Sequence, residues 1–240
     1  MFTPFGVFNE IHTAKPAFLT VKEAASLNKN DRIVDGGFLF YPRWGAGIAA
    51  HGDGVIGGRD LTYDILVANG DQQDANPFEE DENTSKSLTA RLRMDVSEGV
   101  RLGYSFYRDR LSSPSYTLLQ SHGLEAEFVR SKFRVLAEVA FGSLGLAGGG
   151  AQKQIGWYVQ PSVHLNKGWT PYLRLDFVNP NRRLSDVGGR DFIVGVNLEL
   201  SKNFQLKVEN NSFKGGSKSS LAQFPGRGYH EIKAAVVLGF

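Results

Sequence analysis

Apolar and polar residues alternate with a period of two along most of this chain, and no other feature constrains its fold as strongly. The C-terminal stretch YHEIKAAVVLGF places Ile232, Ala234, Val236, Leu238 and Phe240 in one apolar row, whereas the other row begins charged. Because successive side chains of a strand point to opposite faces, this stretch predicts a strand with one apolar face. The same alternation predicts about twelve strands, at residues 1–8, 44–53, 61–69, 86–96, 99–109, 119–130, 132–142, 154–165, 169–178, 191–201, 203–213 and 229–240.

The connections between these segments alternate between short and long. Short turns are predicted at residues 54–60, 97–99, 131–132, 166–168 and 202–203. Long loops are predicted at about 70–85, 110–120, 143–153, 179–190 and 212–228. Outer-membrane barrels have this layout, with short periplasmic turns, long external loops and an even number of strands. An even number places both termini at the periplasmic end, where the last strand is expected to pair with the first.

Composition narrows the alternatives only slightly. The net charge of +2 gives no argument for nucleic acid binding, and the lack of cysteine excludes disulfides and thiolate metal sites. No apolar run approaches the roughly 18 residues of a transmembrane helix, and no secretory signal is visible, so we expect that the true N-terminus lies upstream or has been removed. A soluble all-β protein would also alternate, but a barrel of about twelve strands is too wide for side chains to fill. We therefore predict an all-β fold, a transmembrane antiparallel up-and-down β-barrel forming a single outer-membrane domain over residues 1–240.

The polar rows of the predicted strands carry charges of both signs. In a barrel with a wet lumen they would line the pore, and the predicted pore-lining residues are Arg91, Arg93, Arg101, Glu125, Glu127, Arg134, Glu138, Arg174, Asp176, Glu199, Lys207, Glu209, Glu231 and Lys233. Opposed charges across a lumen give a transverse field that favours small polar solutes over apolar ones. The alternative left open is that the charges only plug the barrel with salt bridges.

A long inserted loop is predicted at about 9–43, after the first strand. Thr20 and Glu23 have the spacing of a capping box that opens a short helix. A segment of this length is often functional. It folds into the lumen and sets the constriction in one interpretation, or lies outside as a lid or exposed surface in the other.

The apolar row that ends the chain also predicts a partner. A C-terminal Phe with apolar residues at alternate positions before it resembles the recognition signal of outer-membrane barrel assembly. Ile232, Val236, Leu238 and Phe240 match that pattern, so the expected partners are the barrel assembly machinery and outer-membrane lipid. An ordinary buried C-terminal strand is the alternative.

Several stretches resemble the porins of the phosphate-selective O and P type. FTPFGVFNE looks like the strand of that family that precedes a long loop. LTYDILVANGD looks like its strand that enters an outer loop. GWYVQPSVHL and PYLRLDF are similar to its paired strands near the C-terminus. Such porins have about sixteen strands, so the resemblance implies that this chain matches their later portion. Phosphate specificity does not carry over, because it would call for a ladder of Lys and Arg rather than mixed signs.

Enzyme chemistry finds little support in the sequence. Ser162 and His164 share a face of one strand, but such side chains lie about 7 Å apart, too far for a nucleophile and its base. The histidines are scattered without metal-ligand spacing, and the acidic run from Asp71 to Glu82 lacks the spacing of a calcium loop. We expect no catalytic residues, no metal and no cofactor.

These features predict a porin of the bacterial outer membrane. It would form a water-filled channel for the passive diffusion of small hydrophilic solutes or ions, and homotrimers are common among porins. The alternative is a non-conducting outer-membrane barrel that acts as a scaffold or adhesin through its external loops.

Overall fold

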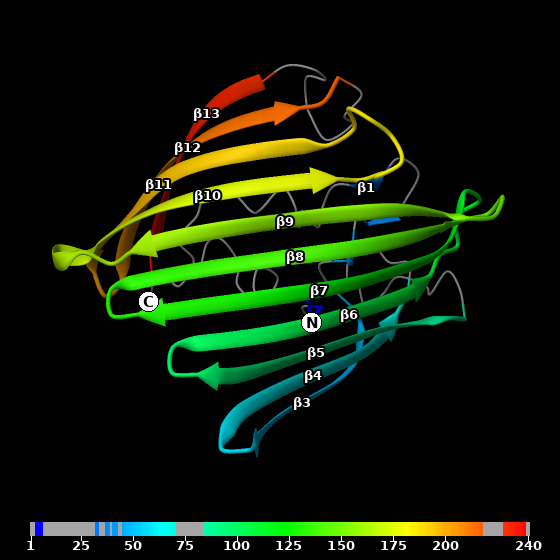
Figure 1. The fold of residues 1–240 in the computed structure, drawn as a ribbon, viewed down its shortest axis with the longest axis horizontal. Coiled ribbons are helices and arrows are strands. Elements are labelled where there is room, and N and C mark those ends of the chain that lie inside the picture. The colour runs from blue at the N-terminus through cyan, green and yellow to red at the C-terminus, as the bar shows by residue number, and fades with distance from the viewer. Residues whose placement is uncertain are drawn as a thin grey trace.

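The computed structural model describes residues 3–6, 32–33, 37–38, 40–42, 45–70, 84–217 and 228–238. These residues form an all-β fold dominated by one sheet of 11 strands, in which every strand pairs antiparallel with its neighbours along the chain (Figure 1). The strands are β3 (Gly47–Ile56), β4 (Arg59–Asn69), β5 (Lys86–Ser97), β6 (Val100–Arg110), β7 (Tyr116–Arg130), β8 (Phe133–Leu146), β9 (Ala151–Val163), β10 (Trp169–Asn179), β11 (Gly189–Ser201), β12 (Phe204–Gly215) and β13 (Gly228–Leu238). The predicted up-and-down antiparallel sheet is therefore confirmed.

Two small elements complete the described part of the chain. A hairpin of β1 (Arg32–Ile33) and β2 (Gly37–Phe38) lies within the predicted loop of 9–43. A short 3₁₀ turn, η2 (Asn166–Gly168), connects β9 to β10. No helix in the described ranges has the length and hydropathy to cross a membrane.

The strands next to two predicted loops are longer than the alternation suggested. β7 begins at Tyr116, β8 continues to Leu146 and β9 begins at Ala151. The connections are therefore only residues 111–115 and 147–150, and the predictions of 110–120 and 143–153 were too long. Burial explains the extension of β8, because Leu144 is fully buried in an apolar cluster and holds the strand in register past Gly142.

The predicted first strand at 1–8 is wrong where the structure describes it. Residues 3–6 have no ladder partner in the described sheet. Pro4 has no N–H to donate to a ladder, the Phe5 N–H donates to the Thr3 carbonyl at 2.8 Å, and Gly6 has φ of +64°. These features bend the segment. The expected closure is also absent, since β13 pairs only with β12 and β3 only with β4 among the described strands.

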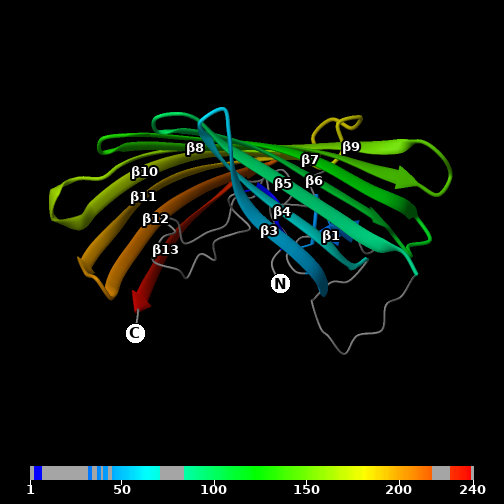
Figure 2. The ribbon, with the colours of Figure 1, turned by 90° about the horizontal axis from the view of Figure 1, so that it is seen from below.

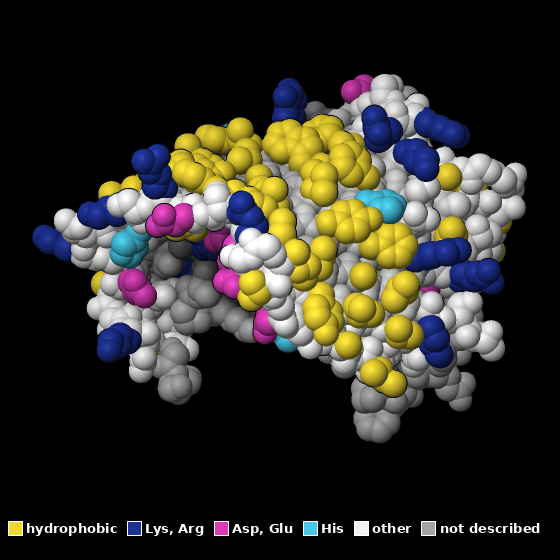
Figure 3. All heavy atoms as spheres, turned by 60° about the horizontal axis from the view of Figure 1, so that its bottom comes forward, with side chains coloured by type: hydrophobic (Ala, Val, Ile, Leu, Met, Phe, Trp, Pro, Cys, Tyr) yellow, Lys and Arg dark blue, Asp and Glu magenta, His cyan; other side chains and the backbone are white. Residues whose placement is uncertain are grey.

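The sheet is strongly curved, and its two faces differ in character. Figure 2 shows the arch of strands with the N-terminal segment inside its concave side. We call the side chains on the concave face the inner row and those on the convex face the outer row. Outer-row apolar side chains are exposed, for example Leu175 at 47% and Leu124 at 52%, and hydrophobic side chains gather over this face in Figure 3. Exposed apolar surface of this extent is typical of contact with a membrane or a partner.

An aromatic cluster fills part of the concave face. The Phe5 ring stacks on Tyr41 with ring centroids 4.3 Å apart, and both are almost fully buried beside Phe40. They pack on inner-row side chains of β6 to β10, namely Tyr107, Leu119, Leu136, Ala140, Leu144, Tyr158 and Val178.

Backbone hydrogen bonds and glycines fix that cluster against the sheet. The Ser121 hydroxyl donates to the Phe40 carbonyl at 2.6 Å, and the Gly6 N–H donates to the Ser105 hydroxyl at 3.1 Å. A Cβ on Gly123 would come within 2.8 Å of the Phe5 ring, so only glycine admits the ring there. Residues 40–42 of the predicted long loop thus lie on the inner face, whereas the predicted helix near Thr20 falls outside the described residues.

Candidate pore lining

The structure places all the charged residues predicted to line a pore on one face of the sheet. Antiparallel registers link them from strand to strand, so that Arg93 opposes Gly103, Gly103 opposes Glu125, and Glu125 opposes Glu138. The same inner row contains Arg91, Arg93, Arg101, Glu125, Glu127, Arg134, Glu138, Arg174, Asp176, Glu199, Lys207, Glu209, Glu231 and Lys233. That they line an ion path stays a prediction.

The tightest ion pair of this face joins β5 to β7. Arg91 Nη2 donates to Glu125 Oε1 at 2.8 Å, Arg91 Nε donates to Glu125 Oε2 at 3.2 Å, and both side chains are buried. Arg93 Nε lies 4.0 Å from Glu125 Oε1. The intervening strand β6 presents Gly103, where a Cβ would meet Glu125 Oε1 at 2.5 Å. Glycine therefore opens the path by which one carboxylate reaches two arginines across a strand.

Carboxylates form a row on the far side of that pair. Glu138 opposes Glu125, and Asp176 opposes Asp191 on the next strand pair, with Tyr158 of β9 between Glu138 and Asp176. Like charges directly opposite each other are destabilising, so each needs a compensating donor. The Tyr158 hydroxyl donates to Glu138 Oε1, and the guanidinium of buried Arg174 lies 3.8 Å from Asp176.

A second polar cluster lies on β10 to β12. The Tyr172 hydroxyl donates to Glu209 Oε2 at 2.8 Å, and the Asn211 amide donates to Glu209 Oε1 at 3.3 Å. Tyr172 crosses β11 at Gly195, where a Cβ would lie 2.2 Å from its ring. Glycine again leaves the space that lets partners two strands apart meet. Lys207 is fully buried on the same strand as Glu209.

Comparison with known proteins identifies the fold at low sequence identity. No family model matches the chain, and no curated protein sequence matches it. Among solved structures, Salmonella typhi OmpF in complex with daunomycin superposes with a TM-score of 0.66 at 10% identity, covering 98% of this chain and 73% of that one. The anion-selective porin from Comamonas acidovorans superposes with a TM-score of 0.59 at 12% identity, covering 78% of this chain. The chain has a porin-type fold.

The likeness to these porins is a likeness of fold and covers only part of their length. The porin-type sheet spans 55% of the length of the Comamonas porin. The general porin fold expected from the sequence is confirmed, but neither neighbour is described as phosphate-selective, so the resemblance to the O and P type stays a prediction.

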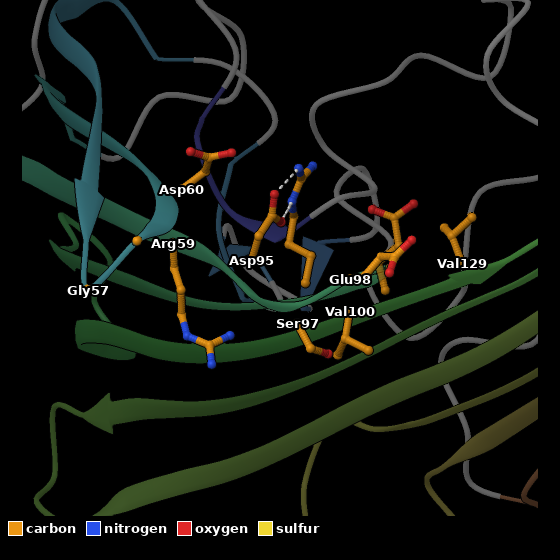
Figure 4. A pocket seen from close by; sticks show the side chains of 12 residues that line it. Gly57, Arg59, Asp60, Asp95, Ser97, Glu98, Val100 and Val129 are labelled. Atoms are coloured by element: carbon orange, nitrogen blue, oxygen red, sulfur yellow. Dashed lines mark hydrogen bonds and ion pairs between the residues drawn. The ribbon is translucent and has the colours of Figure 1, made fainter.

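The ion pairs at the short-turn end of the porin-type sheet are more exposed than the pair of Arg91 and Glu125. Arg101 donates from Nε to Asp95 Oδ1 at 2.6 Å, and Arg134 Nη2 lies 2.7 Å from Glu127 Oε1. A pocket of about 700 Å³ opens here between the turns of β3–β4 and β5–β6. Figure 4 shows Asp60 and Asp95 on the same side of the ribbon, with Arg59 on the other. Acidic groups and the paired Arg101 thus line one mouth of the inner face.

Several inner-row residues were missed by the sequence prediction. Asp191, Tyr158 and Tyr172 are buried members of the clusters above, and each keeps the period-two spacing from predicted residues of its own strand. The alternation could have found them. Asp191 was missed because the predicted strand began at that residue. The two tyrosines fall in the predicted polar rows, but only charged residues were named as pore lining.

Ser162 and His164, which were considered as a nucleophile and its base, each form a hydrogen bond with a different group. The Ser162 hydroxyl donates to the Arg134 carbonyl at 3.3 Å, and His164 Nδ1 lies 3.0 Å from the Thr170 hydroxyl. The described residues contain no group of three His, Cys, Asp or Glu that could hold a metal ion. The acidic run from Asp71 to Glu82 lies outside the described residues.

The predicted assembly signal is described only in part. Ile232, Val236 and Leu238 lie in the outer row of β13 and are well exposed. Phe240 falls outside the described residues, so the signal stays a prediction.

Proposed function

We propose that this chain forms the wall of a bacterial outer-membrane channel through which small hydrophilic solutes or ions diffuse passively. One observation carries the proposal: every Asp and Glu of the described strands lies in the inner row, while the outer row is apolar through its middle. A soluble sheet has no reason to keep its acidic groups on the concave side. A barrel with a wet lumen and a lipid-facing exterior requires that division.

Buried amides give further support for water on the inner face. The side-chain oxygens of Gln160, Asn197 and Gln205 have no hydrogen-bond partner within the described ranges. Burying a polar group without a partner costs free energy. An ordered water held between these side chains on the inner face would supply the missing hydrogen bonds.

The arrangement of charge supports polar rather than apolar solutes. Arg91 and Arg93 lie on β5, while Glu138, Asp176 and Asp191 lie on β8, β10 and β11. Arg174 and Lys207 add cations to that same sector, so charges of both signs face the lumen and give local transverse fields, which low-dielectric surroundings strengthen. The aromatic cluster of Phe5, Phe40 and Tyr41 narrows the same face. The signs are mixed along the wall, so the proposal does not extend to phosphate.

The test is conductance of the purified protein in planar bilayers, with a variant that changes the charge of the wall. Arg93→Gln combined with Arg134→Gln removes two partly exposed cations and leaves the buried Arg91–Glu125 pair intact. The reversal potential in a salt gradient should shift toward cations, because charged side chains set selectivity. The shift should shrink at high salt, where the screening length falls to about 3 Å at 1 M.

The control is Leu92→Val, an outer-row change beside Arg93 that should leave the reversal potential unchanged. A channel that conducts without any shift would place both arginines outside the ion path. A folded protein that never conducts would refute the channel and favour a scaffold or adhesin barrel.

Assembly gives a separate expectation. We propose that the chain is one outer-membrane domain over residues 1–240, inserted by the barrel assembly machinery and able to form homotrimers. Deleting Phe240 should lower the amount of heat-resistant protein in outer-membrane fractions, because the terminal aromatic belongs to the assembly signal. Equal insertion of the truncated and full chains would remove Phe240 from that role.

A further inference from the structure

The outer row carries charges of only one sign. Its charged residues in the described strands are Arg59, Lys86, Arg108, Arg110, Arg130, Lys153, Arg190 and Lys214, with no Asp or Glu among them. Most of these cations lie where the strands meet the longer connections. Figure 3 shows Lys and Arg side chains flanking the hydrophobic band, several of them at the end away from the short turns.

A pocket of about 220 Å³ lies within this cationic end. Its lining includes Gln120, His122, Phe141, Ser143, Lys153 and Arg182. Of these six, all but Arg182 belong to the outer row of β7, β8 and β9, whereas Gly142 and Gln154, which also line the pocket, belong to the inner row. Lys153 opposes Ser143 in the ladder, and its ammonium donates to the Ser143 hydroxyl at 2.9 Å. Two cations and a hydroxyl therefore meet at one opening.

The position of Arg182 is set by the backbone. The connection of residues 180–188 lies over the start of β9, where the Arg182 N–H donates to the Lys153 carbonyl at 2.8 Å. This bond holds the second cation beside the first. Both side chains are exposed, so they can reach a group outside the sheet.

The floor of the pocket marks the border of the apolar band. The two ring nitrogens of His122 lie 2.7 Å from the Tyr104 hydroxyl and 3.0 Å from the Gln120 amide nitrogen, which fixes the ring. Phe106 packs against the same imidazole with centroids 5.3 Å apart. Leu124 lies next to His122 in the outer row and is half-exposed. An occupant that is anionic at one end and apolar at the other fits this border.

We propose that this pocket, named the Lys153–Arg182 pocket, binds the phosphate of an anionic lipid headgroup in the leaflet next to the long connections. Phosphate accepts charge-assisted hydrogen bonds from ammonium and guanidinium groups, and the hydroxyl and amide of Ser143 and Gln120 supply neutral donors. The acyl chains of such a lipid would lie along Leu124 and Phe141. No carboxylate of the outer row in the described strands opposes an anion here. The inference rests on the proposed function only in placing the outer row in a membrane.

The test measures lipid retention by the full chain in phosphatidylcholine nanodiscs that contain lipid A as a phosphate-bearing probe. Lys153→Gln combined with Arg182→Gln should weaken retention of lipid A by roughly 10- to 30-fold, because each cation near an anionic surface contributes about one tenfold step or slightly less. The matched control is Arg59→Gln combined with Arg130→Gln, which removes the same charge from the outer row at the short-turn end.

Three outcomes would overturn the proposal. If both double variants lost the same amount of lipid A retention, the retention would result from the overall positive charge of the outer row and not from the pocket. Displacement of lipid A by excess inorganic phosphate would make the pocket a site for a free anion. Unchanged retention in the Lys153 and Arg182 variant would exclude the pocket. Conductance recorded on the same samples separates this result from the channel, because a non-conducting protein that retains lipid A refutes only the proposed function.

Discussion

Replacing Glu125 with Gln should lower the free energy of unfolding by about 3–5 kcal/mol. The change removes one negative charge that compensates Arg91 and approaches Arg93, and it keeps the side-chain volume. Arg91 is buried at 3% exposure and cannot turn to bulk water. Two guanidinium groups of like charge would then remain side by side. Urea unfolding of the protein in detergent micelles measures the loss.

Glu127→Gln is the matched control for this substitution. Glu127 lies two residues further along β7 on the same face, and it pairs with Arg134 in a more exposed setting. Exposed pairs contribute about 0–1 kcal/mol, so the control should lose little. Combining Glu125→Gln with Arg91→Met should recover part of the loss, since a buried pair can be replaced by apolar groups at small cost. Equal losses for the two single changes would mean that water screens both pairs alike.

The division of the sheet into two rows could be predicted from the sequence almost completely. It results from one local rule, because a strand sends alternate side chains to opposite faces whatever its neighbours are. Glu125 and Glu138 needed only their position between apolar residues to be assigned to the inner row. The same rule gave the outer row of β10, including Leu173 and Leu175.

The pairing within the inner row could not be predicted in the same way. Which arginine meets Glu125 depends on the register of three strands and on Gly103, whose missing side chain lets the carboxylate pass. The spacing of residues in the sequence does not indicate that the Glu125 side chain crosses β6 at Gly103. The crossing of Tyr172 at Gly195 has the same origin. From the sequence alone, each glycine indicates only a weakened strand. The strand register is needed to show that a side chain of a neighbouring strand crosses it.

The prediction for the N-terminal segment failed for a different reason. Alternation in residues 1–8 is compatible with a strand, but Pro4 and Gly6 allow a bend that the pattern does not register. Burial of Phe5 against Tyr41 and Tyr107 then stabilises the bent form on the inner face. Long-range packing, which a local pattern cannot report, decided between the two conformations.

The outer row makes the second large prediction, Leu175→Arg. Leu175 lies near the middle of β10, between the outer-row residues Val159 and Phe192 of the flanking strands. In a lipid-facing row near the midplane, an arginine costs about 2–4 kcal/mol, since its charge must leave water or distort the bilayer. Unfolding in lipid vesicles should show this loss, and the loss should diminish in urea titrations of detergent micelles, where water reaches the side chain more easily.

The same substitution on the inner face supplies the comparison that decides the orientation of the sheet. Asn197→Arg places the guanidinium in a pocket of about 240 Å³ that Glu199 and Gln205 also line. Glu199 offers a carboxylate there, beside the cations of Lys132 and Arg134, so the free energy of unfolding should fall by less than the about 2–4 kcal/mol expected for arginine at position 175. Arginine at position 175 should therefore destabilise the protein more than arginine at position 197. The reverse order would mean that the apolar row faces water or a protein partner and that the charged row is the dry one, which would remove the physical basis of the channel.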